Sequence, residues 1–190
     1  MSPVTLIRGA NASVTNLLPA VSSITVGFSW TVVQSNGPAT EVVACAIVCG
    51  QDGKAVSGEH VVFFNQMLSP DEEVAYDPDG SLPGGDAEQI DVSLAKIPSN
   101  VMSIALVLYV NPDLRNPGTF DGVRDAVVRV LDRSGAEALR YEIETKDLGP
   151  TSAVVAAELY RRGNEWKFRA VGQGYAGGVR DVAKNFGFTL

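Results

Sequence analysis

Histidine and cysteine are scarce in this chain of 190 residues, which has one histidine, His60, and two cysteines, Cys45 and Cys49. A single histidine, with no serine or cysteine in a nucleophile motif, argues against a metalloenzyme or a histidine-based acid–base site. The cysteines lie four positions apart in a strand-like run, roughly 13 Å and therefore beyond the roughly 7 Å limit for a disulfide. With no further thiol or imidazole beside them, they are predicted to be buried, reduced and structural rather than metal ligands.

Long apolar runs and an excess of positive charge are also missing. No apolar run approaches the length of about eighteen residues that a membrane-spanning helix needs. Residues Met1–Ala10 show no basic segment followed by an apolar one, so no signal peptide is expected, and with reduced cysteines this predicts a cytoplasmic protein. The net charge of −7, from 22 acidic and 15 basic residues, argues against a nucleic-acid partner.

Turn residues and short strand patterns are abundant. The 19 glycines and 10 prolines suit an all-β architecture, and a mean hydropathy of +0.09 is that of an ordinary soluble protein. Residues Ile24–Val33 alternate between apolar and small or polar side chains, as in a strand with one buried face. Val42–Cys49 and Met102–Val110 are apolar nearly throughout, which is typical of strands buried on both faces.

Further strands complete the predicted fold. They are expected at Val4–Arg8, Ala12–Asn16, His60–Phe64, Val74–Tyr76, Gln89–Val92, Val123–Asp132, Ala138–Glu144, Ser152–Tyr160 and Trp166–Val171. A turn is expected at Ser35–Pro38, a single helical turn at Ser93–Pro98, and a C-terminal helix at Val179–Phe186. About ten strands at this spacing predict an all-β fold, a two-sheet β-sandwich with short peripheral helices, in a single domain over residues 1–190.

The glycines Gly172, Gly174 and Gly177 follow a strand and precede a helix, with the spacing of the dinucleotide-binding fingerprint. That fingerprint requires a βαβ unit of about thirty residues and an acidic residue about twenty positions further on. The chain printed here ends at Leu190, thirteen residues after Gly177. We therefore interpret the glycines as a tight turn that lets the last helix pack closely against a sheet.

A long loop, Ser69–Gly85, and its exit concentrate negative charge, and no lysine or arginine lies between Lys54 and Lys96. Loops of this length are usually functional. Oxygen-rich segments spaced by glycine suit calcium, which takes six to eight oxygen ligands in flexible geometry. The spacing is not that of an EF-hand, and a solvated acidic loop without a bound ion is the alternative.

The C-terminal part of the chain resembles a known family. Residues Glu158–Arg162, together with the run Trp-Lys-Phe-Arg-Ala-Val-Gly-Gln-Gly-Tyr-Ala-Gly-Gly at 166–178, are similar to the C-terminal signature of the TerD family of tellurite-resistance and stress-response proteins. The segment His60–Gln66 is similar to that family's Phe-Val-Phe-Tyr-Asn-Gln strand. The resemblance implies a single TerD-like domain, a non-enzymatic cytoplasmic protein and a calcium-binding β-sandwich whose ligands come from several acidic motifs.

The resemblance also indicates which residues would hold calcium. Gly85–Glu88 resembles the family's Gly-Asp-Asp-Glu segment, and Asp79 falls near its Gly-Asp-Asn segment. The family's Asp-x-Asp-x-Ser motif is replaced by Glu41-x-Val43-x-Cys45, and neither valine nor a thiol suits a hard cation. The calcium ligands expected here are therefore Asp77, Asp79, Asp86, Glu88 and Glu41, in a site that this replacement weakens.

Two mechanisms follow from these residues. In the first, Ca2+ binds the acidic loop, orders it and presents a surface to an unidentified protein partner. In the second, the calcium site has been lost and the chain is a metal-independent scaffold for protein interactions. An enzyme that uses acidic residues as acid and base is a distant third possibility.

Overall fold

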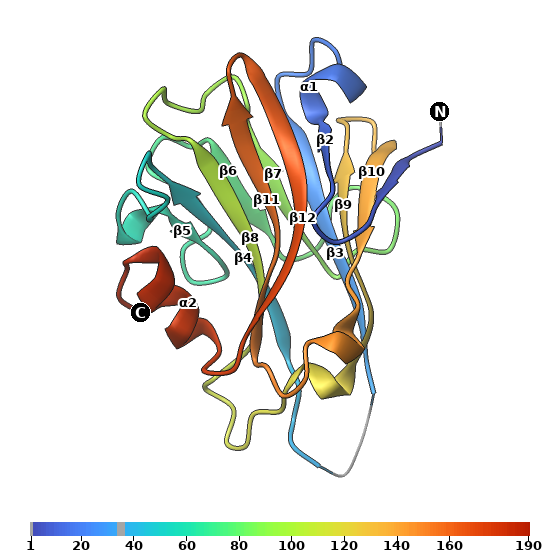
Figure 1. The fold of residues 1–190 in the computed structure, drawn as a ribbon, viewed down its shortest axis with the longest axis vertical. Coiled ribbons are helices and arrows are strands. Elements are labelled where there is room, and N and C mark those ends of the chain that lie inside the picture. Colours follow the sequence, from blue (N-terminus) through green and yellow to red (C-terminus); the bar gives the residue numbers. More distant parts are fainter. Residues whose placement is uncertain (1, 34–36) are drawn as a thin grey trace.

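Two six-stranded sheets pack face to face in the computed structural model, which describes residues 2–33 and 37–190 (Figure 1). Sheet A has the order β1 (Val4–Leu6), β10 (Glu137–Glu142), β9 (Val123–Leu131), β3 (Ile24–Val32), β7 (Glu88–Val92), β6 (Val74–Asp77). Sheet B has the order β2 (Asn11–Ser13), β12 (Glu165–Tyr175), β11 (Ala153–Arg162), β8 (Ser103–Val110), β4 (Val42–Cys49), β5 (Val61–Val62). The predicted all-β sandwich is confirmed.

The helices are short and peripheral. They are α1 (Val14–Leu17), α2 (Val179–Phe186) and 3-10 turns at Gly58–His60, Phe120–Gly122 and Thr145–Asp147. The C-terminal helix has the predicted bounds. Among the described residues, no helix has both the length and the apolar character needed to cross a membrane.

Three local predictions have separate outcomes. The strand predicted at Ala12–Asn16 gives way to α1, because the Ser13 hydroxyl caps the backbone N–H of Asn16. The single turn predicted at Ser93–Pro98 is present, closed by a hydrogen bond from the Lys96 N–H to the Ser93 carbonyl. The turn predicted at Ser35–Pro38 falls largely outside the described residues.

The main core lies between the sheets, where Phe28, Ile90, Leu106 and Phe168 are fully buried. Val26 and Phe28 occupy the inner face of β3, as its alternating pattern predicts. The outer face of β3 is covered as well, because the segment 78–87 that joins β6 to β7 lies over it. This loop brings the acidic residues onto the outer face of sheet A.

Helix α2 covers the outer face of sheet B and encloses a second apolar cluster. Its buried Val179 and Val182 pack with Cys45, Ile47 and Val107 from β4 and β8. Both faces of β4 are therefore covered, which explains its uninterrupted apolar sequence. The prediction of buried, unpaired cysteines is confirmed, and burial raises the pKa of each thiol to about 12.

The C-terminal glycines have two separate structural roles. Gly172 has a φ of +64° at an irregularity inside β12, and a side chain there would clash with the Tyr141 hydroxyl. Gly177 and Gly178 form the turn that the sequence predicts before α2. Gly174 and Gly172 belong to the strand rather than to that turn.

Candidate functional site

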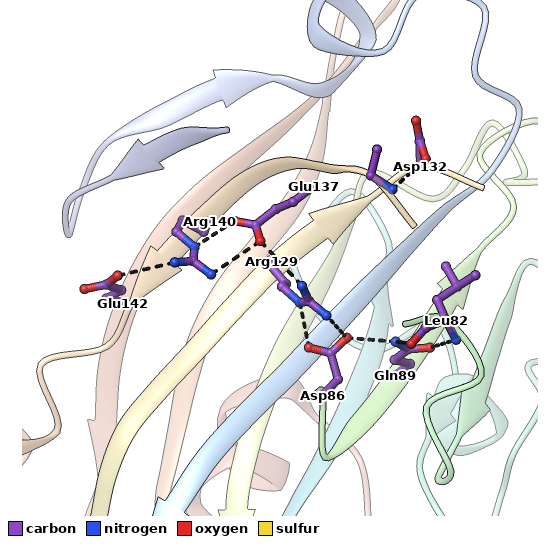
Figure 2. A network of polar contacts seen from close by, with 9 residues as sticks. Leu82, Asp86, Gln89, Arg129, Asp132, Glu137, Arg140 and Glu142 are labelled. Atoms are coloured by element: carbon purple, nitrogen blue, oxygen red, sulfur yellow. Dashed lines mark hydrogen bonds and ion pairs between the residues drawn. The ribbon is translucent and has the colours of Figure 1, made fainter. Parts of the chain in front are cut away.

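The acidic loop at 78–87 is anchored to sheet A by the amide of Gln89, which is only 1% exposed on β7. The Gln89 side chain accepts a hydrogen bond from the Leu82 N–H and donates one to the Leu82 carbonyl, both at 3.0 Å. Its Nε2 also donates to Asp86 Oδ2 at 2.7 Å (Figure 2). The loop is therefore held against the sheet by directional hydrogen bonds and is not a freely solvated acidic segment.

Asp86 forms a two-point ion pair with Arg129, which projects from the outer face of β9. The guanidinium Nε lies 2.6 Å from Asp86 Oδ1, and Nη2 lies 2.8 Å from Oδ2 (Figure 2). The side chain of Asp86 is 1% exposed and that of Arg129 is 10% exposed. The hydrogen bonds that Arg129 donates to Asp86 raise the pKa of Arg129. Both carboxylate oxygens of Asp86 accept hydrogen bonds.

Two glycines make room for this ion pair. Gly27 on β3 pairs with Arg129, and a side chain at Gly27 would overlap the carboxylate of Asp86. Gly84 has a φ of +135°, and a side chain there would overlap the guanidinium of Arg129. The backbone of the loop thus approaches the sheet closely enough to bury the pair.

The ion pair continues into a network across β9 and β10. Arg129 Nη1 lies 3.5 Å from Glu137 Oε2, and Arg140 Nε lies 2.7 Å from Glu137 Oε1 without the alignment of a hydrogen bond. Arg140 also lies 3.8 Å from the exposed Glu142 (Figure 2). Charges of alternating sign therefore cross the outer face of sheet A from the acidic loop to β10.

Asp77 and Asp79 lie in the first turn of the acidic loop. The Asp77 carboxylate accepts the backbone N–H groups of Asp79 at 3.1 Å and Ser81 at 2.9 Å. Hydrogen bonds from Ser81, with further ones from Asp79 and Gly80, lower the pKa of Asp77. Asp79 is exposed. Asp77 thus stabilises the turn, as an aspartate commonly does where β-strands are joined.

Glu88 lies on the other side of sheet A and connects the two sheets. Its Oε2 accepts the backbone N–H of Ala44, on β4 of sheet B, at 2.6 Å. Burial raises the pKa of Glu88, with a smaller contribution from the negative charge of Glu41, while hydrogen bonds from Ala44 and the Tyr76 hydroxyl oppose that rise. Glu41 itself is exposed just before β4.

The five predicted calcium ligands therefore occupy different places. Asp86 faces Arg129 outside sheet A, Asp77 and Asp79 lie at the start of the same loop, and Glu88 and Glu41 lie at the junction with sheet B. Within the described part of the chain, ligand atoms of three residues come within 4.8 Å of one another at His60, Asp71 and Glu73. None of the five belongs to that group, and calcium binding stays a prediction.

Sequence reasoning missed both Arg129 and the group of His60, Asp71 and Glu73. Arg129 is distant in sequence from Asp86, and the pairing of β3 with β9 is what brings it under the loop. Asp71 and Glu73 belong to the predicted acidic stretch, but no spacing motif links them to His60. The one feature of the sequence that could have pointed to this group was the lone histidine, His60, at the start of a predicted strand.

Comparison with known proteins identifies the family. The sequence model that defines the TerD domain family matches residues 1–186 of this chain. The chain is 32% identical over 187 residues to the tellurium resistance protein TerD of Serratia marcescens, covering 97% of each chain. It is 30% identical over 192 residues to general stress protein 16U of Bacillus subtilis, covering 98% of each.

A solved structure supports the same fold. The crystal structure of a homologue of the telluride resistance protein TerD from Streptomyces coelicolor superposes with a TM-score of 0.65. That comparison covers 86% of this chain and 96% of the other, at 20% identity. From the match of the domain over nearly its whole length, we conclude that this chain belongs to the TerD family.

Proposed function

We propose that this TerD-family chain is a non-enzymatic stress-response protein that acts as a calcium-independent scaffold for protein partners. The observation that carries the proposal is the two-point ion pair of Asp86 with Arg129. A guanidinium already neutralises the best buried of the predicted ligands and orders the acidic loop. The guanidinium of Arg129, on β9, therefore supplies the positive charge that the loop binds.

The energetics favour this assignment. Breaking a buried ion pair by withdrawing one partner costs about 3–5 kcal/mol, because the other charge is left uncompensated. A calcium ion that recruits Asp86 would have to meet that cost. At 1.4 kcal/mol for each tenfold in affinity, the cost corresponds to a loss of affinity of roughly a hundredfold to several thousandfold.

The reactive side chains support a non-enzymatic role. Cys45 and Cys49 are buried with pKa values of about 12, so their thiols are protonated at neutral pH and are poor nucleophiles. Among its relatives are proteins named for tellurium resistance and general stress, names that describe a phenotype and not a reaction. Reduced thiols and the acidic surface fit a cytoplasmic protein that binds other proteins rather than nucleic acid.

Calcium binding is the second candidate, and the surroundings of Glu88 favour it. The negative charge of Glu41 contributes to the raised pKa of Glu88 at the junction of the two sheets, and a cation would relieve that repulsion. Asp77 and Asp79 are the other predicted ligands that Arg129 does not bind. This site would use fewer carboxylates than the family pattern implies.

Thermal melting in chelator, in roughly millimolar calcium and in magnesium distinguishes the two candidates, since that calcium level fills even weak sites. The scaffold proposal expects no calcium-specific shift. A site filled at a hundred times its dissociation constant would add about 2.7 kcal/mol. For a chain of this size that raises the midpoint by roughly 5–11 °C. Such a rise, lost in Glu88→Gln, would overturn the scaffold proposal and establish the calcium site.

Asp86→Ala is unsuitable as the diagnostic variant. It leaves the buried guanidinium of Arg129 without its carboxylate partner, so it destabilises the fold whether or not calcium binds. Glu59→Gln provides a matched control for Glu88→Gln, since it removes one exposed carboxylate that is not among the predicted calcium ligands. Affinity capture repeated in chelator and in calcium should then recover the same protein partner at equal yield. A partner that is retained in calcium alone would contradict the proposal.

A further inference from the structure

One side of the sandwich, where β5 and β6 are the edge strands, contains a group of three residues of types that commonly bind metals. The group is separate from the segment 78–87. On this side β5 is the last strand of sheet B and β6 is the last strand of sheet A. His60 ends the 3-10 turn before β5, and Asp71 and Glu73 lie in the turn before β6. One ligand atom from each of the three lies within 4.8 Å of the other two.

The carboxylate of Glu73 has one oxygen without a hydrogen-bond partner. Its side chain is 1% exposed, and its Oε2 accepts a hydrogen bond from the Ser69 hydroxyl at 2.8 Å. The other oxygen, Oε1, is buried and has no hydrogen-bond partner. Over residues 2–33 and 37–190, no lysine or arginine forms an ion pair with Glu73. A buried carboxylate oxygen without a donor is costly, and a bound cation would relieve that cost.

The imidazole ring of His60 has a hydrogen-bond partner on one of its two nitrogens. Its Nδ1 lies 2.8 Å from the Ser57 hydroxyl. When Nδ1 donates its proton to that hydroxyl, Nε2 carries the lone pair that a metal requires. Histidine ligands of metals generally donate their other ring N–H to an outer partner in this manner. Asp71 is exposed, so the group is open to solvent on its side and leaves room for water ligands.

We propose that His60, Asp71 and Glu73 bind a divalent first-row transition metal, with zinc as the best fit. Two carboxylates neutralise a divalent ion, and the imidazole selects against calcium and magnesium, which take oxygen ligands. Zinc accepts both imidazole and carboxylate and completes four-coordination with one water. The bound metal connects the edge of sheet A to the edge of sheet B. This site involves none of the residues on which the calcium-independent scaffold proposal rests.

The neighbouring Glu72 supplies a matched control. It is exposed, and its carboxylate lies 3.3 Å from the ammonium group of Lys96 rather than in the group of three. Glu72→Gln removes the same charge as Glu73→Gln from the adjacent position in the same turn. Any effect of net charge alone must therefore be equal in the two variants, whereas loss of a ligand affects Glu73→Gln alone.

The test is zinc binding to the full, tag-free chain after treatment with chelator, measured by isothermal titration calorimetry and by native mass spectrometry. One zinc ion per chain is expected, with affinity reduced at least tenfold in Glu73→Gln and in His60→Ala and changed less than twofold in Glu72→Gln. Cobalt, as a spectroscopic substitute, should give visible absorption that His60→Ala alters. The absence of zinc binding, or equal affinity in Glu73→Gln and Glu72→Gln, would overturn the proposal.

Asp71→Asn keeps the test decisive if Glu73→Gln fails to fold, because Asp71 is exposed and its replacement leaves the buried turn intact. It should weaken zinc binding at least tenfold, and an unchanged affinity would also overturn the site. A calcium-dependent rise in melting temperature would defeat the scaffold proposal and leave the zinc result unaffected. The two failures are therefore distinguishable.

Discussion

At the scale of single residues, the ion pair between Asp86 and Arg129 fixes the acidic loop against sheet A. Replacing Asp86 by asparagine leaves the guanidinium buried, with Glu137 at 3.5 Å as its remaining acidic neighbour. We expect the free energy of unfolding to fall by about 3–5 kcal/mol. The melting temperature should fall by roughly 6–20 °C, and urea denaturation measures the free energy directly.

The control for this prediction is Asp79→Asn, which removes an exposed carboxylate of the same loop and should change stability by less than about 0.5 kcal/mol. The double variant Asp86→Asn with Arg129→Gln should recover part of the loss, since it removes the unpaired charge. An Asp86→Asn protein as stable as the Asp79→Asn protein would mean that the ion pair does not hold the loop.

Glu88 makes stability depend on pH in the direction opposite to a surface carboxylate. Its pKa is raised in the folded chain, chiefly by burial, so its contribution to stability is present below the ordinary carboxyl pKa and is lost as pH rises through the raised value. Glu88→Gln should therefore melt above the wild type at pH 7. Near pH 4 the two proteins should melt at similar temperatures.

Thermal melts of Glu88→Gln across this pH range, in chelator, measure the difference. Glu59→Gln is the control, because it removes the same charge from an exposed position. A Glu88→Gln protein that is less stable than the wild type at pH 7 would show that the ionised form of Glu88 is the favoured one. That result would strengthen the case for a cation at this position.

At the scale of elements, helix α2 and sheet B form a unit that the apolar sequence of β4 anticipates. Val182 is fully buried against the outer face of that sheet. Val182→Ala should cost about 2 kcal/mol through lost burial and the cavity left behind. Lys184→Ala on the exposed side of the same helix should cost less than about 0.5 kcal/mol.

Denaturant unfolding of the two variants tests this assignment, and a fluorescent thiol reagent adds a second reading. Because the helix covers Cys45, its loosening in Val182→Ala should increase the rate of thiol labelling under native conditions. Equal labelling in Val182→Ala and Lys184→Ala would mean that α2 does not protect the cysteines.

Strands and helices with an uninterrupted hydrophobic pattern were predictable from the sequence. The residues and strands that they contact were not. The bounds of β4 and α2 follow from an apolar run and from a helical pattern after glycine. The change from β2 to α1 depends on one capping contact of Ser13, which a strand-like pattern hides. The acidic loop was visible as composition, but its contact with Arg129 depends on strand register, which no local sequence feature specifies.

At the scale of the whole molecule, the sandwich has two sides where the sheets end, and the chain crosses between sheets on both. The segment between β5 and β6 crosses on one side, and the segment between β1 and β2 crosses on the other (Figure 1). Gly9, with a φ of +85°, lies in the second crossing and donates its N–H to Ala170 at 2.8 Å. Each crossing ties an edge of sheet A to an edge of sheet B.

The crossing between β1 and β2 has a consequence for biosynthesis. Val4 pairs with Leu139 in sheet A, and Ala12 pairs with Phe168 in sheet B. β1 therefore cannot pair until β10 has been synthesised, and β2 cannot pair until β12 has been synthesised. Contacts of such long sequence separation slow folding, and an unpaired strand edge is exposed in the meantime. We therefore expect the backbone N–H and C=O groups of β1 and β2 to stay without their strand partners for much of the chain's synthesis.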